Sequence, residues 1–212
     1  MAKPGTWFTG ETLVFLRNLA ENNNRDWFAA NRHRDEVYVR QSALRFNMDF
    51  VPRPHRISRH FIEDPRPVGG SLSRIHRDTR FSHDKWPFKA HAGNRVPHER
   101  NCDVYVPVFY IHVEPGGTFV GVGMWLPDAP MLKTIRDAIV ENPTAWRSAR
   151  DDRAFTAKFE LGSAMLARSL RGCDPVHPRI DAFQRENFAA WHGFDGNTLT
   201  RDRRLDAFTD AR

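Results

Sequence analysis

An apolar and aromatic run of ten residues constrains the fold more than any other feature of this chain. Residues 104–113 read Val-Tyr-Val-Pro-Val-Phe-Tyr-Ile-His-Val, which is typical of a β-strand, and Pro107 indicates an edge or a bulge. The turn sequence Glu-Pro-Gly-Gly follows at 114–117, and residues 118–126 read as a second strand. The pattern therefore predicts an antiparallel hairpin within a central sheet.

Helical patterns lie on both sides of this hairpin. Thr9 is placed to cap a helix from residue 10 or 11 to about 21, and Asn24 to cap a longer one that ends before Pro52. Apolar residues recur along that longer helix at steps of three and four, which predicts a buried face at positions 27, 30, 34, 37, 41, 44, 48 and 51. Further helices are expected at 128–140, 143–151 and 178–191, with another short element within 161–170. The expected fold class is α+β, with N-terminal helices, a central antiparallel sheet with a hairpin, and C-terminal helices.

Length and composition indicate one soluble domain. A chain of 212 residues fits a single domain over 1–212, in which residues 200–212 form a terminal helix or a loose tail. No apolar run is long enough to span a membrane, and the N-terminus lacks the apolar region of a secretory signal. Cys102 and Cys173 are the only cysteines and have no CxxC spacing, so they fit a reducing compartment. We therefore expect a cytoplasmic protein without a membrane partner.

The positive charge of the chain lies in its N-terminal half. The net charge is +6, and residues 1–100 hold 18 Lys and Arg against 11 Asp and Glu, whereas residues 101–212 hold 14 against 15. A basic excess of this kind favours an anionic partner, either a nucleic acid or a phosphorylated or carboxylated small molecule. Charges of both signs are interleaved, which makes the small molecule the first choice and the nucleic acid the alternative.

One segment concentrates the polar side chains that carry chemistry. Residues 69–91 read GGSLSRIHRDTRFSHDKWPFKAH. If residues 71–81 form a strand, alternation places Arg74, His76, Asp78 and Arg80 on one face. Such a face is costly to bury unless its groups pair with each other or meet a ligand. Residues 82–101 read as an irregular excursion after that strand.

We interpret this segment as a pocket for an anionic group. Arginine grips carboxylate or phosphate with a two-pronged fork, and lysine adds a point charge. The expected ligand-binding residues are Arg74, Arg77, Arg80, Lys89 and His91. The expected catalytic residues are His76, for proton transfer, Asp78, which also orients an arginine, and Lys85. Whether a reaction follows binding stays open, and the competing interpretation is an ion-pair network that pins a loop to the sheet.

The same segment carries a resemblance to a known family. The arrangement GGS-x-x-RI-x-RDTRFS-x-DK-x-P-x-K-x-H resembles the central motif of the domain of unknown function 2461 family, conserved hypothetical proteins of bacteria and fungi. The likeness extends to FLRNLAENNNRDWF at 15–28, to the hairpin turn at 114–117 and to residues 171–178, and so spans roughly 8–190. It implies that the basic motif acts as a unit, and it implies no particular activity or cofactor. Trp86 and Phe88 depart from the pattern, where a smaller residue and a Tyr are expected.

A metal-dependent enzyme is a further alternative. His76, His83, His91, His98 and His112 gather around the motif and the first strand, and two His with one carboxylate such as Asp78, Asp84 or Glu114 suit iron(II) or zinc. No HxxxH or HExxH spacing occurs, and the surrounding guanidinium groups repel a cation. The sequence therefore favours an anion over a metal, and it gives no oligomeric state.

Overall fold

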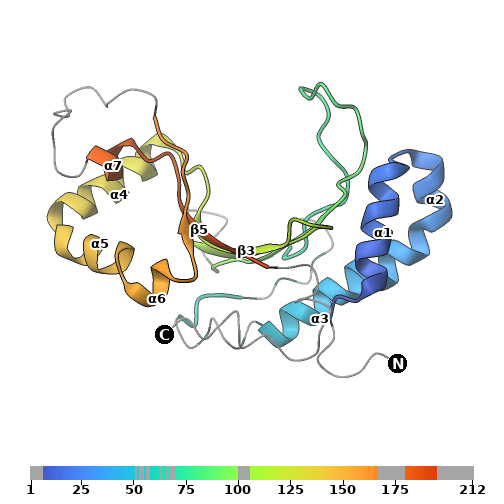
Figure 1. Cartoon of the computed structure of the whole chain (residues 1–212), viewed down its shortest axis with the longest axis horizontal. Coiled ribbons are helices and arrows are strands. Elements are labelled where there is room, and N and C mark those ends of the chain that lie inside the picture. The colour runs from blue at the N-terminus through green and yellow to red at the C-terminus, as the bar shows by residue number, and fades with distance from the viewer. Residues whose placement is uncertain are drawn as a thin grey trace. The chain divides into compact units, whose positions relative to one another are not determined.

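The computed structural model describes residues 7–50, 52, 55, 58–62, 64, 66, 70–99, 106–166 and 180–194. Its helices are α1 (Gly10–Glu21), α2 (Arg25–Arg34), the π-helix η1 (Asp35–Arg40), α3 (Gln41–Phe50), α4 (Ala129–Glu141), α5 (Pro143–Arg150), α6 (Arg153–Thr156) and α7 (Ile180–Gln184). Its strands are β1 (Ala92–Val96), β2 (Val108–Val113), β3 (Phe119–Met124), β4 (Glu160–Leu161) and β5 (Phe188–Gly193), in the sheet order β1-β2-β3-β5-β4 (Figure 1). The expected α+β fold class is confirmed.

The chain divides into two compact units. The first comprises residues 1–99, 108–120 and 193–210, and the second comprises residues 100–107, 121–192 and 211–212. A single domain over 1–212 stays a prediction, and the expected tail at 200–212 and both cysteines lie outside the described residues. Within the part of the chain that is described, no helix has the length and apolar character needed to cross a membrane.

Several helices begin where the capping residues predict. Asn24 Oδ1 accepts a hydrogen bond from Trp27 N at 2.9 Å, and Asp128 Oδ1 accepts one from Met131 N at 3.0 Å. Asn142 Oδ1 accepts one from Ala145 N at 3.1 Å, directly before the proline that opens α5. Each cap satisfies a backbone N–H that the first helical turn leaves without a partner. These helix starts are confirmed because they are fixed locally.

The predicted buried face of the long N-terminal helix is wrong. The segment from Arg25 to Phe50 is interrupted by η1, whose wider π-turns add a residue and rotate the following helix relative to the preceding one. No residue of α2 is buried, and Val51 lies outside the described residues. The buried positions after the shift are Val39, Ser42, Ala43, Phe46, Asn47 and Phe50.

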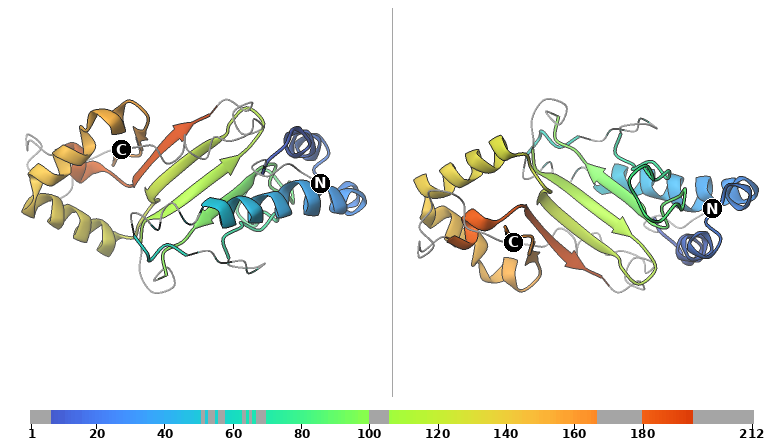
Figure 2. Two further views of the ribbon diagram at one scale, coloured as in Figure 1. Left: turned by 90° about the horizontal axis from the view of Figure 1, so that it is seen from below. Right: turned by 90° about the horizontal axis from the view of Figure 1, so that it is seen from above.

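The core of the first unit lies between these helices and β1 and β2. The two strands pair in antiparallel register from Ala92↔Val113 to Val96↔Phe109, and Figure 2 shows β2 and β3 side by side. Ile111 and Val113 are buried on one face of β2, and Asn94 reaches α3 from the same face of β1. Alternation therefore puts Tyr110 and His112 on the opposite face.

Two further predictions of secondary structure are wrong. Residues 71–81 make only isolated bridges, at Leu72 and His76, and are not a strand, whereas β1 lies in the stretch expected to be irregular. Residues 178–191 were expected to be helical, but the described part is the short α7 followed by β5. At β1 and β5, pairing with another strand of the sheet overrides the local preference of the residues. Residues 167–170 of the element expected within 161–170 are not described, and β4 lies at its start.

Candidate functional site

The polar motif forms an arm, which we define as residues 73–91. Its two limbs pair through Arg77 N, which donates to Pro87 O at 2.9 Å, and Lys89 N, which donates to Ile75 O at 2.8 Å. Ser73 N donates to Gly93 O at 2.8 Å, which joins the first limb to β1. The arm is the long teal-to-green excursion in Figure 1. Its backbone is therefore held by hydrogen bonds between the limbs and to β1.

Phe88 anchors the base of the arm. Its backbone N–H donates to Asn23 Oδ1 and its carbonyl accepts from Asn23 Nδ2, each at 3.0 Å. Its ring stacks on Phe28 with centroids 4.2 Å apart and is 3% exposed. The His76 ring lies 5.2 Å from the Phe88 ring. The aromatic residue at position 88 thus fastens the arm to the turn between α1 and α2.

The charges at the tip of the arm compensate each other. Arg77 Nη1 lies 2.5 Å from Asp84 Oδ2, and Arg80 Nη2 lies 2.6 Å from Asp78 Oδ2. Lys85 Nζ donates to the Thr79 carbonyl at 2.9 Å. These contacts are exposed and contribute little stability. The hydrogen bonds from Arg80 and Arg77 nevertheless lower the pKa of the Asp78 and Asp84 carboxyls, respectively.

Arg74 and Lys89 differ from the cations of the tip. They lie on the two limbs at the base of the arm, where Arg74 is exposed and Lys89 is half-buried. Burial, and then the neighbouring Arg74 charge, lower the pKa of Lys89 below its ordinary value. Within the described part of the chain neither side chain has a carboxylate partner. Among the described residues, two neighbouring positive charges therefore lack a compensating carboxylate.

His91 extends this basic group without adding charge. Burial and the neighbouring His112 lower the pKa of His91 to about 4, against the opposing effect of Glu114. Lys89 and Arg77 act in the same direction as His112. The imidazole is therefore neutral at pH 7 and offers one N–H donor and one acceptor nitrogen.

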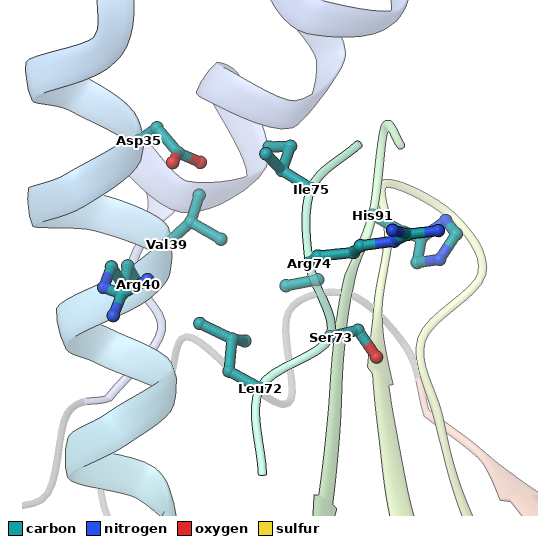
Figure 3. Close-up of a pocket in the computed structure, with 9 residues that line it drawn as sticks. Asp35, Val39, Arg40, Leu72, Ser73, Arg74, Ile75 and His91 are labelled. Atoms are coloured by element: carbon teal, nitrogen blue, oxygen red, sulfur yellow. The ribbon is translucent and has the colours of Figure 1, made fainter. Parts of the chain in front are cut away.

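A small pocket opens beside Arg74, between η1 and residues 72–75 (Figure 3). Its cavity volume is about 60 Å³, and it is lined by Asp35, Val39, Arg40, Leu72, Ser73, Arg74, Ile75, His91 and Ala92. Ligand pockets for drug-sized molecules measure about 300–1,000 Å³, so this one takes a few water molecules or a small group. Figure 3 shows Arg74 extending away from η1, on the side where His91 lies.

Asp35 gives this pocket an acid that titrates near neutrality. It lies on η1, and π-turns of this kind are frequent at functional sites. Burial raises the pKa of Asp35 to about 6, and the neighbouring Glu36 acts in the same direction. Arg40 and Arg32 oppose this effect.

The structure brings together only part of the predicted site. Arg74, Lys89 and His91 lie at the base of the arm, where the His91 ring contacts His112. The prediction of the ligand site did not include Tyr110, His112 and Glu114. Asp78 pairs with an arginine as expected, but that arginine is Arg80, and the pair lies at the tip of the arm, which also carries Lys85. His76 lies against Phe88. The sequence signal for Tyr110, His112 and Glu114 was their spacing of two residues, which places them on one face of a strand.

The metal alternative receives no support from the described residues. Across these ranges no group of three or more His, Cys, Asp or Glu side chains is arranged to hold a metal ion. His91 and His112 instead contact each other with ring centroids 4.3 Å apart and planes tilted by 31°, and His112 pairs with Glu114.

The protein thus belongs to the α+β class and carries a basic arm that pairs with the edge of the sheet. The model of the family described as conserved hypothetical protein (DUF2461) matches residues 11–211, nearly the whole chain, and the chain belongs to this family. Comparison with curated proteins and with solved structures found no match.

Proposed function

We propose that this protein binds an anionic small molecule between Arg74 and Lys89 at the base of the arm. One observation carries the proposal: these neighbouring cations have no carboxylate partner among the described residues, whereas Arg77 and Arg80 on the same arm each have one. A fold that used the motif only as an ion-pair network would compensate the half-buried lysine before the exposed tip.

An anion at this position removes an electrostatic cost. Lys89 is partly withdrawn from water and lies near a like charge, and both effects disfavour its ammonium form. A phosphate or carboxylate in reach of both side chains restores the missing opposite charge. Hydrogen bonds to charged groups contribute about 1.5–3 kcal/mol each, so two such contacts supply about 3–6 kcal/mol, and binding no tighter than about millimolar is expected once association costs are subtracted.

Titration with inorganic phosphate and with succinate tests this proposal. Binding is followed by backbone amide NMR shifts at constant ionic strength, with chloride as the reference anion. Arg74→Met and Lys89→Met are expected to weaken binding at least tenfold. Arg80→Met is the matched control, because that arginine lies on the same arm but is compensated by Asp78. Equal losses in all three variants, or none in the first two, contradict the proposal.

A specific feature of the tip favours a second candidate function, the binding of single-stranded nucleic acid. Phe81 is 94% exposed and Trp86 is 50% exposed, and the Arg80 guanidinium lies 5.8 Å from the Phe81 ring. Exposed aromatic rings beside cations stack on nucleobases in a sequence-tolerant way. Fluorescence anisotropy with a labelled oligothymidine tests this candidate. Phe81→Ser is expected to weaken binding, and the affinity should fall steeply with salt.

A further inference from the structure

Three polar side chains follow one another along one face of β2 and its continuation. The Tyr110 hydroxyl lies 3.3 Å from His112 Nδ1, and His112 Nε2 lies 3.0 Å from Glu114 Oε2. Residues two apart in a strand share a face, so this order follows directly from the sequence. The result is a continuous hydrogen-bonded chain from a phenol through an imidazole to a carboxylate.

The direction of these hydrogen bonds follows from the chemistry of the groups. An ionised carboxylate only accepts, so His112 Nε2 carries the proton that Glu114 receives. In the neutral imidazole the other nitrogen then has a lone pair, and the Tyr110 hydroxyl donates to it. His112 is therefore in the tautomer that can accept the tyrosine proton, as in catalytic groups where a carboxylate orients a histidine base.

The surroundings hold the imidazole in this orientation. The His112 side chain is 12% exposed, and its ring stacks on Phe119 at 4.8 Å with an interplanar angle of 11°. His91 packs against it with centroids 4.3 Å apart. Thr118 Oγ1 donates to the Glu114 carbonyl at 3.0 Å and fixes the turn that carries the carboxylate. The ring is thus packed between two neighbours.

Gly93 makes room for the tyrosine hydroxyl. It pairs with His112 in the β1–β2 register, and a Cβ atom at this position would lie 2.6 Å from the Tyr110 oxygen and 3.1 Å from Ser73 Oγ. The hydroxyl therefore occupies the space that a side chain at position 93 would fill. It lies next to the first limb of the arm, on which Arg74 follows Ser73.

We propose that Tyr110 is the proton-transfer group of this site, activated by His112 and Glu114, and that it acts on the anionic ligand. This proposal rests on the anion site at Arg74 and Lys89. The Tyr110 proton moves to His112 Nδ1, which leaves a phenolate and an imidazolium stabilised by the Glu114 carboxylate. The phenolate oxygen then removes one proton from the ligand, and the reverse transfers return both protons. No electron or other group is exchanged, so the reaction class is general acid–base catalysis.

Reaction with an aryl sulfonyl fluoride tests the activation without any ligand. The phenol oxygen attacks sulfur, fluoride leaves, and the phenolic proton passes to His112. Burial, followed by the Glu114 charge, raises the pKa of Tyr110, so without a base this hydroxyl would react slowly. With the base we expect Tyr110 to be labelled at least tenfold faster than Tyr38 at pH 7.5, as measured by peptide mass spectrometry. His112→Asn should reduce the rate to that of Tyr38, and Glu114→Gln should reduce it several-fold.

Two outcomes overturn the proposal. One is a Tyr110 labelling rate no higher than that of Tyr38, and the other is an unchanged rate in a folded His112→Asn variant. If that variant does not fold, ¹⁵N NMR of the unmodified protein decides: a His112 proton on Nδ1 contradicts the inferred direction of transfer. Labelling is measured without phosphate, so a failed phosphate titration would refute the anion site and leave the labelling result to be judged separately.

Discussion

Asn47 and Asn94 hydrogen-bond to each other reciprocally through their fully buried side-chain amides, at 3.0 and 2.7 Å. Asn94 Nδ2 also donates to the Ala43 carbonyl at 3.0 Å, so this pair joins α3 to β1. Replacing one partner leaves buried polar groups without hydrogen bonds, at about 1–3 kcal/mol each. We expect Asn94→Leu to lower the free energy of unfolding by about 2–4 kcal/mol in urea denaturation.

The double variant Asn47→Leu/Asn94→Leu is the control for this prediction. Removing both amides leaves fewer orphaned groups than the two single changes together, so its cost should be clearly smaller than their sum. Strict additivity would mean that the two amides stabilise the fold independently, which contradicts a shared interaction.

Lys89 is predicted to oppose folding at neutral pH. Its pKa is lowered in the folded state by burial and by Arg74, so the unfolded chain binds the proton more tightly. Stability should therefore rise with pH between the lowered value and the ordinary 10.5, and Lys89→Met should abolish this rise. At pH 7 we expect the variant to be slightly more stable, by up to about 1 kcal/mol.

The stability of the Lys89→Met variant separates a binding role of Lys89 from a structural role. Arg80→Met removes the partner of the exposed Asp78 and should leave the free energy of unfolding almost unchanged, because exposed ion pairs contribute little stability. If Lys89→Met instead lowers stability by more than this control, Lys89 holds the fold together, and the proposed anion site loses its basis.

What could be predicted from the sequence was set by interactions between near neighbours in the chain. Asn24, Asp128 and Asn142 cap helices through backbone groups three residues away, so their positions alone locate the helix starts. The hairpin of β2 and β3 has its turn between two strands only a few residues apart. The basic motif at 73–91 could also be located, because its composition is visible without the fold.

What could not be predicted depends on distant contacts. The π-turns at Asp35–Arg40 change the phase of a helix without any proline or glycine to signal it. The strand assignment at 71–81 failed because the limbs of the arm make only isolated pairs, Arg77 N with Pro87 O and Lys89 N with Ile75 O, instead of a continuous ladder. That pairing puts Arg74 beside Lys89 and sends Asp78 and Lys85 to the tip, so one linear motif separates into two groups.

Asp35 is predicted to make stability fall as pH rises. Its pKa is raised from 3.8 to about 6 by burial, so between these values the folded chain holds a proton that the unfolded chain releases. The penalty is complete above about pH 6. We expect Asp35→Asn to stabilise the fold at pH 7.5, on the order of 2 kcal/mol after allowance for partial exposure, and to leave it unchanged at pH 3.5. Thermal unfolding of both proteins at the two pH values measures the difference, and an equal gain at both would show that charge is not the cause.

His91 is predicted to act in the opposite direction over the same range. Its pKa is lowered from 6.5 to about 4, so the unfolded chain binds a proton that the folded chain excludes. The stability of the neutral form is fully present above about pH 6.5 and is lost as pH falls towards 4. We compare the free energy of unfolding of His91→Gln with that of the unmodified protein at each pH. This difference should favour the variant more at pH 5 than at pH 8, by on the order of 1–2 kcal/mol. Urea denaturation at both pH values measures this gain, and NMR titration of the His91 ring gives its pKa directly. A midpoint near 6.5 would show that burial does not act on the His91 ring and would contradict this prediction.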